Sequence, residues 1–216
     1  MKITRPIRAV LFDMDGVMVD SEFVYMKYLL EFAKEKNPAV TMEDINQMVG
    51  RSRQDSWTVM ERAVNNGETW ETLIKEWAER DIYSRIDYRK IFRPEMKTTV
   101  QELKRRGYTV ALVSSTGPKL ISRIVEEVGM RPEFDLIVSG KQFKQSKPNP
   151  EIYHYTADTL GIREDECFVV EDSTVGIEAA YRAGMSIAGL KDDRFGFDQS
   201  KADYYIDSIS DILKYL

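Results

Sequence analysis

The segment Ala9-Val10-Leu11-Phe12-Asp13-Met14-Asp15-Gly16 joins a short apolar run directly to two carboxylates, and this junction is the clearest indication of the fold. Apolar runs of this length, without alternation, are typical of strands that are buried on both faces of a parallel sheet. We expect Asp15 to lie past the end of the strand, in a turn that Gly16 permits, so that both aspartates can reach one site.

Four more apolar runs of the same kind follow along the chain. They are residues 110–113, 136–138, 167–170 and 186–190. Amphipathic helical patterns lie between several of these runs, at residues 118–128, 150–160 and 174–183. Strands that alternate with helices at this spacing predict an α/β fold with a Rossmann-like parallel sheet and helices on both of its sides.

Residues 20–90 break this alternation, because they carry helical periodicity and no convincing strand. Two capping-box patterns, which begin at Thr41 and Ser52, mark helix starts within the stretch. The stretch is too long for a crossover, so we expect a helical domain inserted into an α/β core that comprises residues 1–19 and 91–216. The alternative is one continuous domain with extra helices.

Composition and charge exclude several classes of protein. Of the 216 residues, 43% are hydrophobic and 31% are charged, which is typical of a globular protein with a real core. The net charge of −5 argues against a general nucleic-acid binder, because such proteins need a basic surface. No apolar run approaches the roughly 20 residues of a transmembrane helix, and we see no signal peptide. We expect a cytoplasmic protein without membrane partners, and nothing in the sequence requires more than a monomer.

Polar residues follow three of the expected strands at the edge where ligands of open parallel sheets bind. They are Asp13 and Asp15 after the first strand, Ser114 and Ser115 after the second, and Glu171 and Asp172 after the fourth. An isolated Asp-x-Asp is more often a turn or a helix cap. Here, however, several like charges converge, which is costly unless a cation lies between them. Oxygen ligands without His or Cys favour Mg²⁺.

Positive charge is expected at the same edge. Lys147 precedes Pro148 after the third apolar run, and a residue before proline is held extended, so the next helix cannot absorb it. The alternative is a solvated loop lysine. Ser114 and Thr116 precede the helix that begins at Pro118, whose free backbone N–H groups and dipole favour an anion. Simple N-capping is compatible with this role.

Together these motifs resemble those of the haloacid dehalogenase-like hydrolase superfamily. The resemblance rests on residues 13–22, the strand that ends in Ser114, Lys147-Pro148 and Glu171-Asp172-Ser173, in this order. The helical insert between the first and second motifs is similar to the cap domain of the β-phosphoglucomutase-like branch. Any one motif is common, but the ordered set is specific and covers the whole chain.

The resemblance implies a phosphatase that works through an aspartyl-phosphate. Asp13 would be the nucleophile, and Asp15 would act first as general acid and then as general base. Mg²⁺ would be bound by the Asp13 carboxylate, the Asp15 backbone carbonyl and Asp172. Glu171 would lie in the metal shell or next to it.

The resemblance also implies how the phosphate is held. Ser114, the backbone amide of Ser115 and Lys147 would contact the transferring phosphoryl oxygens. The substrate would be a small phosphorylated metabolite, with a sugar phosphate as the leading candidate, and it would bind between the sheet edge and the cap.

In the insert, Gly50-Arg51-Ser52-Arg53 is similar to the substrate-specificity loop of the branch. The resemblance makes Gly50, Arg51 and Arg53 candidate substrate-binding residues, and Arg53 matches a phosphate-contacting arginine of the sugar-phosphate mutases. The alternative for the two arginines is a solvated helix start. Two departures weaken a mutase interpretation, since Tyr25 stands where those mutases carry a histidine and Val49 where they carry a lysine.

Two other functions stay open at this stage. A β-phosphoglucomutase-type phosphosugar mutase would share every core residue. A phospho-accepting receiver domain, from a different functional class, also pairs an aspartate with Mg²⁺, a hydroxyl and a lysine on a parallel sheet. Receiver domains leave no room for the helical insert and lack an aspartate equivalent to Asp15.

Overall fold

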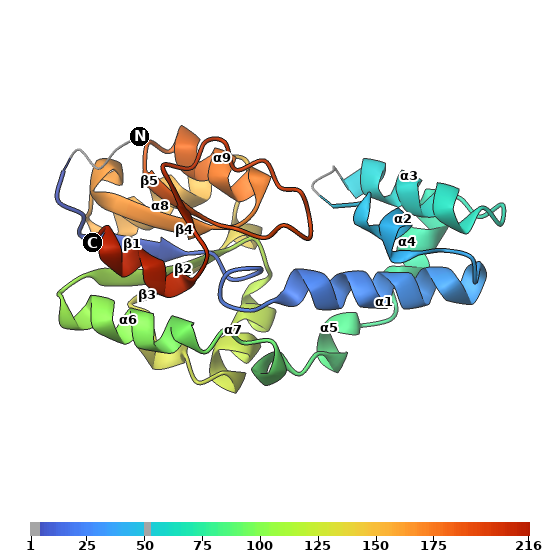
Figure 1. Cartoon of the computed structure of the whole chain (residues 1–216), viewed down its shortest axis with the longest axis horizontal. Coiled ribbons are helices and arrows are strands. Elements are labelled where there is room, and N and C mark those ends of the chain that lie inside the picture. The colour runs from blue at the N-terminus through green and yellow to red at the C-terminus, as the bar shows by residue number, and fades with distance from the viewer. Residues whose placement is uncertain (1–4, 50–52) are drawn as a thin grey trace. The chain divides into compact units, whose positions relative to one another are not determined.

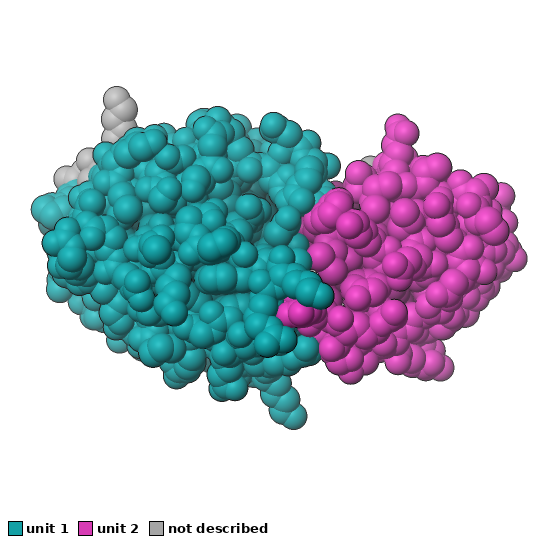
Figure 2. Space-filling view, turned by 60° about the horizontal axis from the view of Figure 1, so that its bottom comes forward, with its two compact units in different colours: residues 1–20, 88–216 teal, residues 21–87 magenta. Residues whose placement is uncertain are grey.

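The computed structural model describes residues 5–49 and 53–216, with Arg53 described by its backbone alone. The chain forms two compact units, which Figure 2 shows in teal and magenta. Residues 1–20 and 88–216 make up the first, here called the sheet unit, and residues 21–87 make up the second, here called the helical unit.

The sheet unit is built on a six-stranded sheet in which every neighbouring pair is parallel. In spatial order the strands are β3 (Leu136–Ser139), β2 (Thr109–Ser114), β1 (Ala9–Phe12), β4 (Cys167–Glu171), β5 (Ser186–Leu190) and β6 (Tyr204–Ile206). The five apolar runs account for β1 to β5, which confirms the predicted parallel α/β fold. The sequence did not predict β6, because this edge strand has three residues and leaves Tyr205 exposed.

Helices cover both faces of the sheet, with α8 and α9 on one face and α6 and α7 on the other (Figure 1). Their bounds are α6 (Glu95–Arg105), α7 (Pro118–Glu127), α8 (Glu151–Leu160) and α9 (Thr174–Arg182). Short 3₁₀ helices lie at Tyr88–Lys90, Arg131–Glu133, Gly140–Gln142, Glu164–Glu166 and Ile209–Lys214. The three predicted helices of this unit are therefore present as α7, α8 and α9. The α7 helix begins at Pro118, where a proline costs no hydrogen bond, and buries Ile121, Ile124 and Val125.

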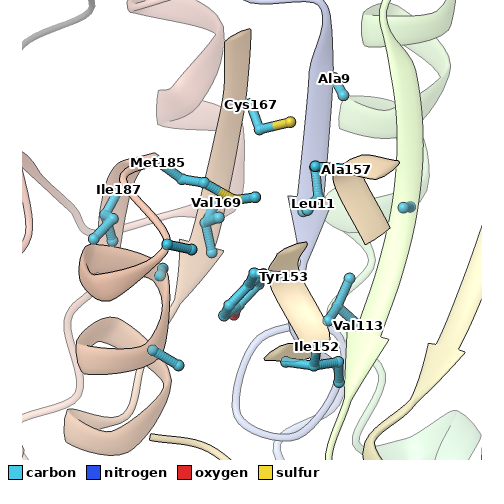
Figure 3. Close-up of a cluster of buried hydrophobic side chains, with 14 of the residues drawn as sticks. Ala9, Leu11, Val113, Ile152, Tyr153, Ala157, Cys167, Val169, Met185 and Ile187 are labelled. Carbon is cyan, nitrogen blue, oxygen red and sulfur yellow. The ribbon is translucent and has the colours of Figure 1, made fainter. Parts of the chain in front are cut away.

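A cluster of buried side chains fills the space between the sheet and the helices α8 and α9 (Figure 3). Leu11 of β1, Val113 of β2 and Val169 of β4 come from the sheet, and Ile152 and Tyr153 come from α8. Removing this apolar surface from water stabilises the sheet unit and holds the strands in register. The cluster thereby fixes the strand ends from which the site is built.

The helical unit contains α1 (Ser21–Lys36), α2 (Met42–Asn46), α3 (Arg53–Val64), α4 (Trp70–Ala78) and α5 (Ile82–Arg85). The predicted capping box is present at α2, where the Thr41 and Asp44 side chains each bond the other's backbone N–H. Phe32, Trp57 and Trp77 form its aromatic core, with ring centroids 5.5 to 6.3 Å apart. No helix in the described part of the chain is both long and apolar enough to cross a membrane.

The loop after β1 is compact and pairs with the segment before α6. The Gly16 N–H donates to the Val19 carbonyl at 2.8 Å, and the Asp20 N–H donates to the Ile91 carbonyl at 2.8 Å. The Arg93 side chain also donates to the Gly16 carbonyl, at 3.3 Å. These bonds hold the residues that follow β1 at the carboxyl edge of the sheet.

Candidate active site

Three of the predicted carboxylates meet where β1 and β4 end side by side. Phe12 pairs with Val170, and the Asp13 N–H donates to the Val170 carbonyl at 3.0 Å. This register places Asp13 next to Glu171 and Asp172, and ligand oxygens of the three carboxylates all lie within 4.8 Å of one another. All three residues are buried, with at most 7% of their surface exposed.

Gly16 allows this close approach. Its φ of +81° belongs to the left-handed region that glycine adopts without steric cost, and a Cβ atom there would lie 1.9 Å from Asp172 Oδ2. Glycine at position 16 therefore allows the backbone to turn with a positive φ and leaves room for the Asp172 carboxylate. Asp15 lies past the end of β1, which ends at Phe12, in agreement with the position expected from the sequence.

The Asp15 carboxylate faces the loop after β2. Its Oδ2 atom accepts hydrogen bonds from Thr116 Oγ1 at 2.8 Å and from Ser114 Oγ at 3.4 Å. Ser139 Oγ donates to the Thr116 carbonyl at 2.6 Å and anchors that loop. The sequence marked Thr116 only as a residue that precedes a helix, since its contact with Asp15 spans two strands.

Lys147 reaches into the carboxylate cluster. Its Nζ donates to Asp13 Oδ1 at 2.6 Å, to Glu171 Oε1 at 2.7 Å and to the Val113 carbonyl at 3.1 Å, which uses all three donors of an ammonium group. Burial by itself would lower the pKa of Lys147, but the carboxylates of Asp13 and Glu171 raise it above its usual range. Lys147 therefore stays a cation in the site.

Two features of the site act in opposite directions on the pKa of Asp13. Burial raises the pKa of Asp13, and the Lys147 ammonium opposes that rise. The same burial strengthens the attraction between the two groups, because few water molecules screen them. A further positive charge at the cluster would keep Asp13 ionised, which is the state that a nucleophile or a metal ligand needs.

Glu171 is held on both of its oxygens. Oε2 accepts from the Asp172 and Ser173 backbone N–H groups and from Ser173 Oγ, at 3.1 to 3.2 Å. Oε1 accepts from Lys147 and from the Tyr153 hydroxyl, the latter at 3.2 Å. Because both oxygens of Glu171 already accept hydrogen bonds, we expect this residue to lie beside the metal ligands, where it holds Lys147, rather than to bind the metal itself.

The loop that would receive the phosphate follows β2. Ser114 is fully buried, and its Oγ accepts from the Thr116 N–H at 3.0 Å. Ser115 Oγ accepts from Ser146 Oγ at 3.1 Å, next to Lys147 in the chain. The loop leads into the first turn of α7, where the helix dipole favours an anion.

The predicted residues of the helical unit are described less completely. Gly50 and Arg51 lie outside the described residues, and Arg53 begins α3 with its side chain undescribed. Their part in substrate binding stays a prediction. Tyr25, at the position where the mutases carry a histidine, accepts a hydrogen bond from Trp77 Nε1 at 3.1 Å.

Comparison with known proteins agrees with this geometry. A family model described as "Haloacid dehalogenase-like hydrolase" matches residues 10–190. The phosphoglycolate phosphatase of Photorhabdus laumondii is 27% identical over 224 residues, which cover 98% of this chain and 93% of the relative. The phosphorylated carbohydrates phosphatase of Thermotoga maritima is 26% identical over 181 residues, or 83% of this chain and 82% of the relative. The structure of β-phosphoglucomutase from Clostridium difficile superposes with a TM-score of 0.73 at 22% identity, over 97% of this chain and 96% of that one, which shows a shared fold.

Proposed function

The chain belongs to the haloacid dehalogenase-like hydrolase family, and we propose that it is a Mg²⁺-dependent phosphatase of a small phosphorylated metabolite. The observation that carries the proposal is the contact of Lys147 Nζ with Asp13 Oδ1 at 2.6 Å, beside the carboxylates of Glu171 and Asp172. Burying three carboxylates together with a lysine has a high desolvation cost, which an ion pair that serves the fold alone does not require. A site that must bind a cation and a phosphoryl group gains from this arrangement.

Asp13 is the proposed nucleophile. Its carboxylate oxygen forms a bond to phosphorus while the ester P–O bond breaks, so that the phosphoryl group is transferred to the enzyme. Lys147 orients the carboxylate and, with Ser114 and the Ser115 amide, faces the charge on the phosphoryl oxygens. Positioning and charge stabilisation supply most of the rate enhancement in reactions of this class.

Asp15 is the proposed acid and base. Its carboxyl proton moves to the leaving oxygen, and the resulting carboxylate then accepts a proton from the water that cleaves the aspartyl-phosphate. A positioned group of this kind contributes roughly 10²–10⁴-fold to rate. The hydrogen bonds from Thr116 and Ser114 to Oδ2 fix the orientation of this carboxylate.

The donor set fits a hard divalent cation. Asp13 and Asp172 offer carboxylate oxygens close enough to share one ion, without a His or Cys donor in the cluster. We propose that these two residues and the Asp15 backbone carbonyl hold Mg²⁺, with Glu171 beside them. The ion, when bound, supplies positive charge that offsets the charge of the phosphoryl oxygens.

The substrate class is a sugar phosphate or a similarly small organic phosphate. The support comes from the two phosphatases above, whose names specify phosphorylated carbohydrates and phosphoglycolate. We propose that residues 20–90 act as the cap that supplies specificity, with Gly50, Arg51 and Arg53 among the contacts. Tyr25 and Val49 favour hydrolysis over a mutase reaction, because they replace the mutases' histidine and lysine.

Phosphate release from a panel of sugar phosphates, phosphoglycolate, p-nitrophenyl phosphate and pyrophosphate, with Mg²⁺ and with EDTA, tests this proposal. We expect Mg²⁺-dependent turnover of at least one sugar phosphate, and a loss of roughly a thousandfold or more in Asp13→Asn. The matched control is Asp158→Asn, at an exposed position of α8, which should keep full activity. Normal turnover by Asp13→Asn would overturn the mechanism, and formation of glucose 6-phosphate from β-glucose 1-phosphate would indicate a mutase.

A further inference from the structure

Tyr153 places a hydroxyl group in the apolar core of the sheet unit. The residue lies on α8 and is completely buried in a cluster that otherwise holds aliphatic and sulfur-containing side chains (Figure 3). A phenylalanine would fill the same space without the cost of burying a hydroxyl. A tyrosine at this position is therefore favourable only if its buried hydroxyl group has a hydrogen-bond partner.

That partner belongs to the active site. The Tyr153 hydroxyl donates to Glu171 Oε1 at 3.2 Å, the oxygen that also accepts from Lys147 Nζ at 2.7 Å. The Tyr153 ring lies under the same ammonium, with Nζ 5.0 Å from the ring centroid, which is within the range of a cation–π interaction. One side chain therefore contacts both members of the Lys147–Glu171 pair.

The two oxygens of Glu171 are held differently. Oε2 is fixed by the backbone N–H groups of Asp172 and Ser173, whereas Oε1 accepts from two side chains, Lys147 and Tyr153. Without the hydroxyl, Lys147 becomes the main group that satisfies Oε1. The ammonium is then drawn toward Glu171 at the expense of its contact with Asp13.

We propose that Tyr153 is a positioning residue of this enzyme, whose hydroxyl and ring hold Glu171 and Lys147 so that the ammonium stays in contact with Asp13. The inference rests on the proposed phosphatase function and adds to it a residue that does not touch the substrate. Burial raises the pKa of Tyr153, so its hydroxyl remains protonated and available as a donor.

The substitution Tyr153→Phe isolates the hydroxyl, because it keeps the ring and the core volume. We expect kcat to fall about tenfold, while KM changes much less. A tenfold loss is the lower end of the range for removing a group that orients a site residue without touching the ligand. Inhibition by orthovanadate, an analogue of the phosphoryl-transfer transition state, should weaken by about the same factor as kcat. A merely structural role would lower the melting temperature without this split between kcat and KM.

A double-mutant cycle tests the route through Glu171. In a Glu171→Gln background, Tyr153→Phe should cost less than roughly twofold, because the carboxylate that the hydroxyl holds has already been removed. Tyr155→Phe is the matched control, since it removes a hydroxyl from the same helix at a residue that is 43% exposed, and it should leave kcat unchanged.

Each remaining result counts against the inference. An active parent with an equally active Tyr153→Phe variant overturns the positioning role alone. The same loss in both backgrounds shows that the hydroxyl does not act through Glu171. A Tyr153→Phe variant that is unfolded by circular dichroism shows that the hydroxyl serves the fold instead. A parent protein that releases no phosphate from any ester overturns the proposed function and this inference with it.

Discussion

Replacing Gly176 by alanine sets helix propensity against the geometry of the site. Gly176 lies in the first turn of α9, where alanine is the better helix former by about 1 kcal/mol at most. A Cβ atom at this position, however, would lie 1.8 Å from Glu171 Oε1. The neighbour cannot yield cheaply, because that carboxylate is 1% exposed and hydrogen-bonded on both oxygens.

The size of the effect follows from what Glu171 would lose. Displacing it breaks a buried ion pair with Lys147, whose side chain is 3% exposed, and breaking such a pair costs about 3–5 kcal/mol. After the gain in helix propensity, we expect the sheet unit of Gly176→Ala to be destabilised by about 2–4 kcal/mol. We also expect kcat to fall by roughly 10–100-fold, since Lys147 loses the group that holds it.

Urea unfolding of the full chain measures this change unit by unit. All three tryptophans, Trp57, Trp70 and Trp77, lie in the helical unit, so their fluorescence reports on that unit, while far-UV circular dichroism reports on both. The transition seen by circular dichroism should move to lower urea, and the fluorescence transition should move less. Val175→Ala, at the neighbouring exposed position, is the control for helix propensity. A Gly176→Ala protein that is as stable and as active as its parent would show that the Glu171 carboxylate accommodates the added methyl group without loss of its contacts.

Two further substitutions test other contacts. Thr116→Val removes the 2.8 Å hydrogen bond to Asp15 with little change in side-chain shape. We expect kcat to fall about tenfold for an alkyl phosphate and less for p-nitrophenyl phosphate, because the nitrophenolate leaving group needs little protonation. Equal losses for the two substrates would contradict a role for Thr116 in holding the proposed general acid. Hydrogen bonds from Arg105 and Arg106 lower the pKa of Glu102 from its usual 4.5 to about 2. This folded-state pKa lies below the unfolded value, so the stabilisation is present above pH 4.5 and is lost as the pH falls toward 2. Glu102→Gln should therefore have a lower urea midpoint than the parent near neutral pH and the same midpoint near pH 2, and a pH-independent difference would contradict the assignment.

The sequence predicted the parallel sheet and the convergence of the carboxylates for one physical reason. Parallel strands end at a common edge, so residues directly after apolar runs, such as Asp13 and Glu171, become neighbours even when they are far apart in the chain. The α7 helix was predictable in the same way, since its proline start and apolar stripe are local features.

Contacts that depend on the direction of a side chain could not be predicted from the sequence. Tyr153 occupies a helix position that periodicity assigns to the core, and nothing local indicates that its hydroxyl meets Glu171, which lies on the next strand of the chain. The link from Thr116 to Asp15 joins two strand ends and was equally hidden. The hydrogen bonds that both oxygens of Glu171 accept likewise become visible only when the atoms are placed.

The charge balance of the cluster explains why the net charge of the chain is a poor guide to its ligand. Two buried carboxylates, those of Asp13 and Glu171, contact the ammonium of Lys147, and a third, that of Asp172, has a ligand oxygen within 4.8 Å of theirs. Burying several carboxylates together is costly, and a divalent cation bound among them would offset that cost. Part of the −5 of the whole chain therefore comes from the carboxylates of the proposed metal site. In the proposed function, a phosphate ester close to the cation, Lys147 and the first turn of α7 would experience this local field at close range, where screening by salt is weakest.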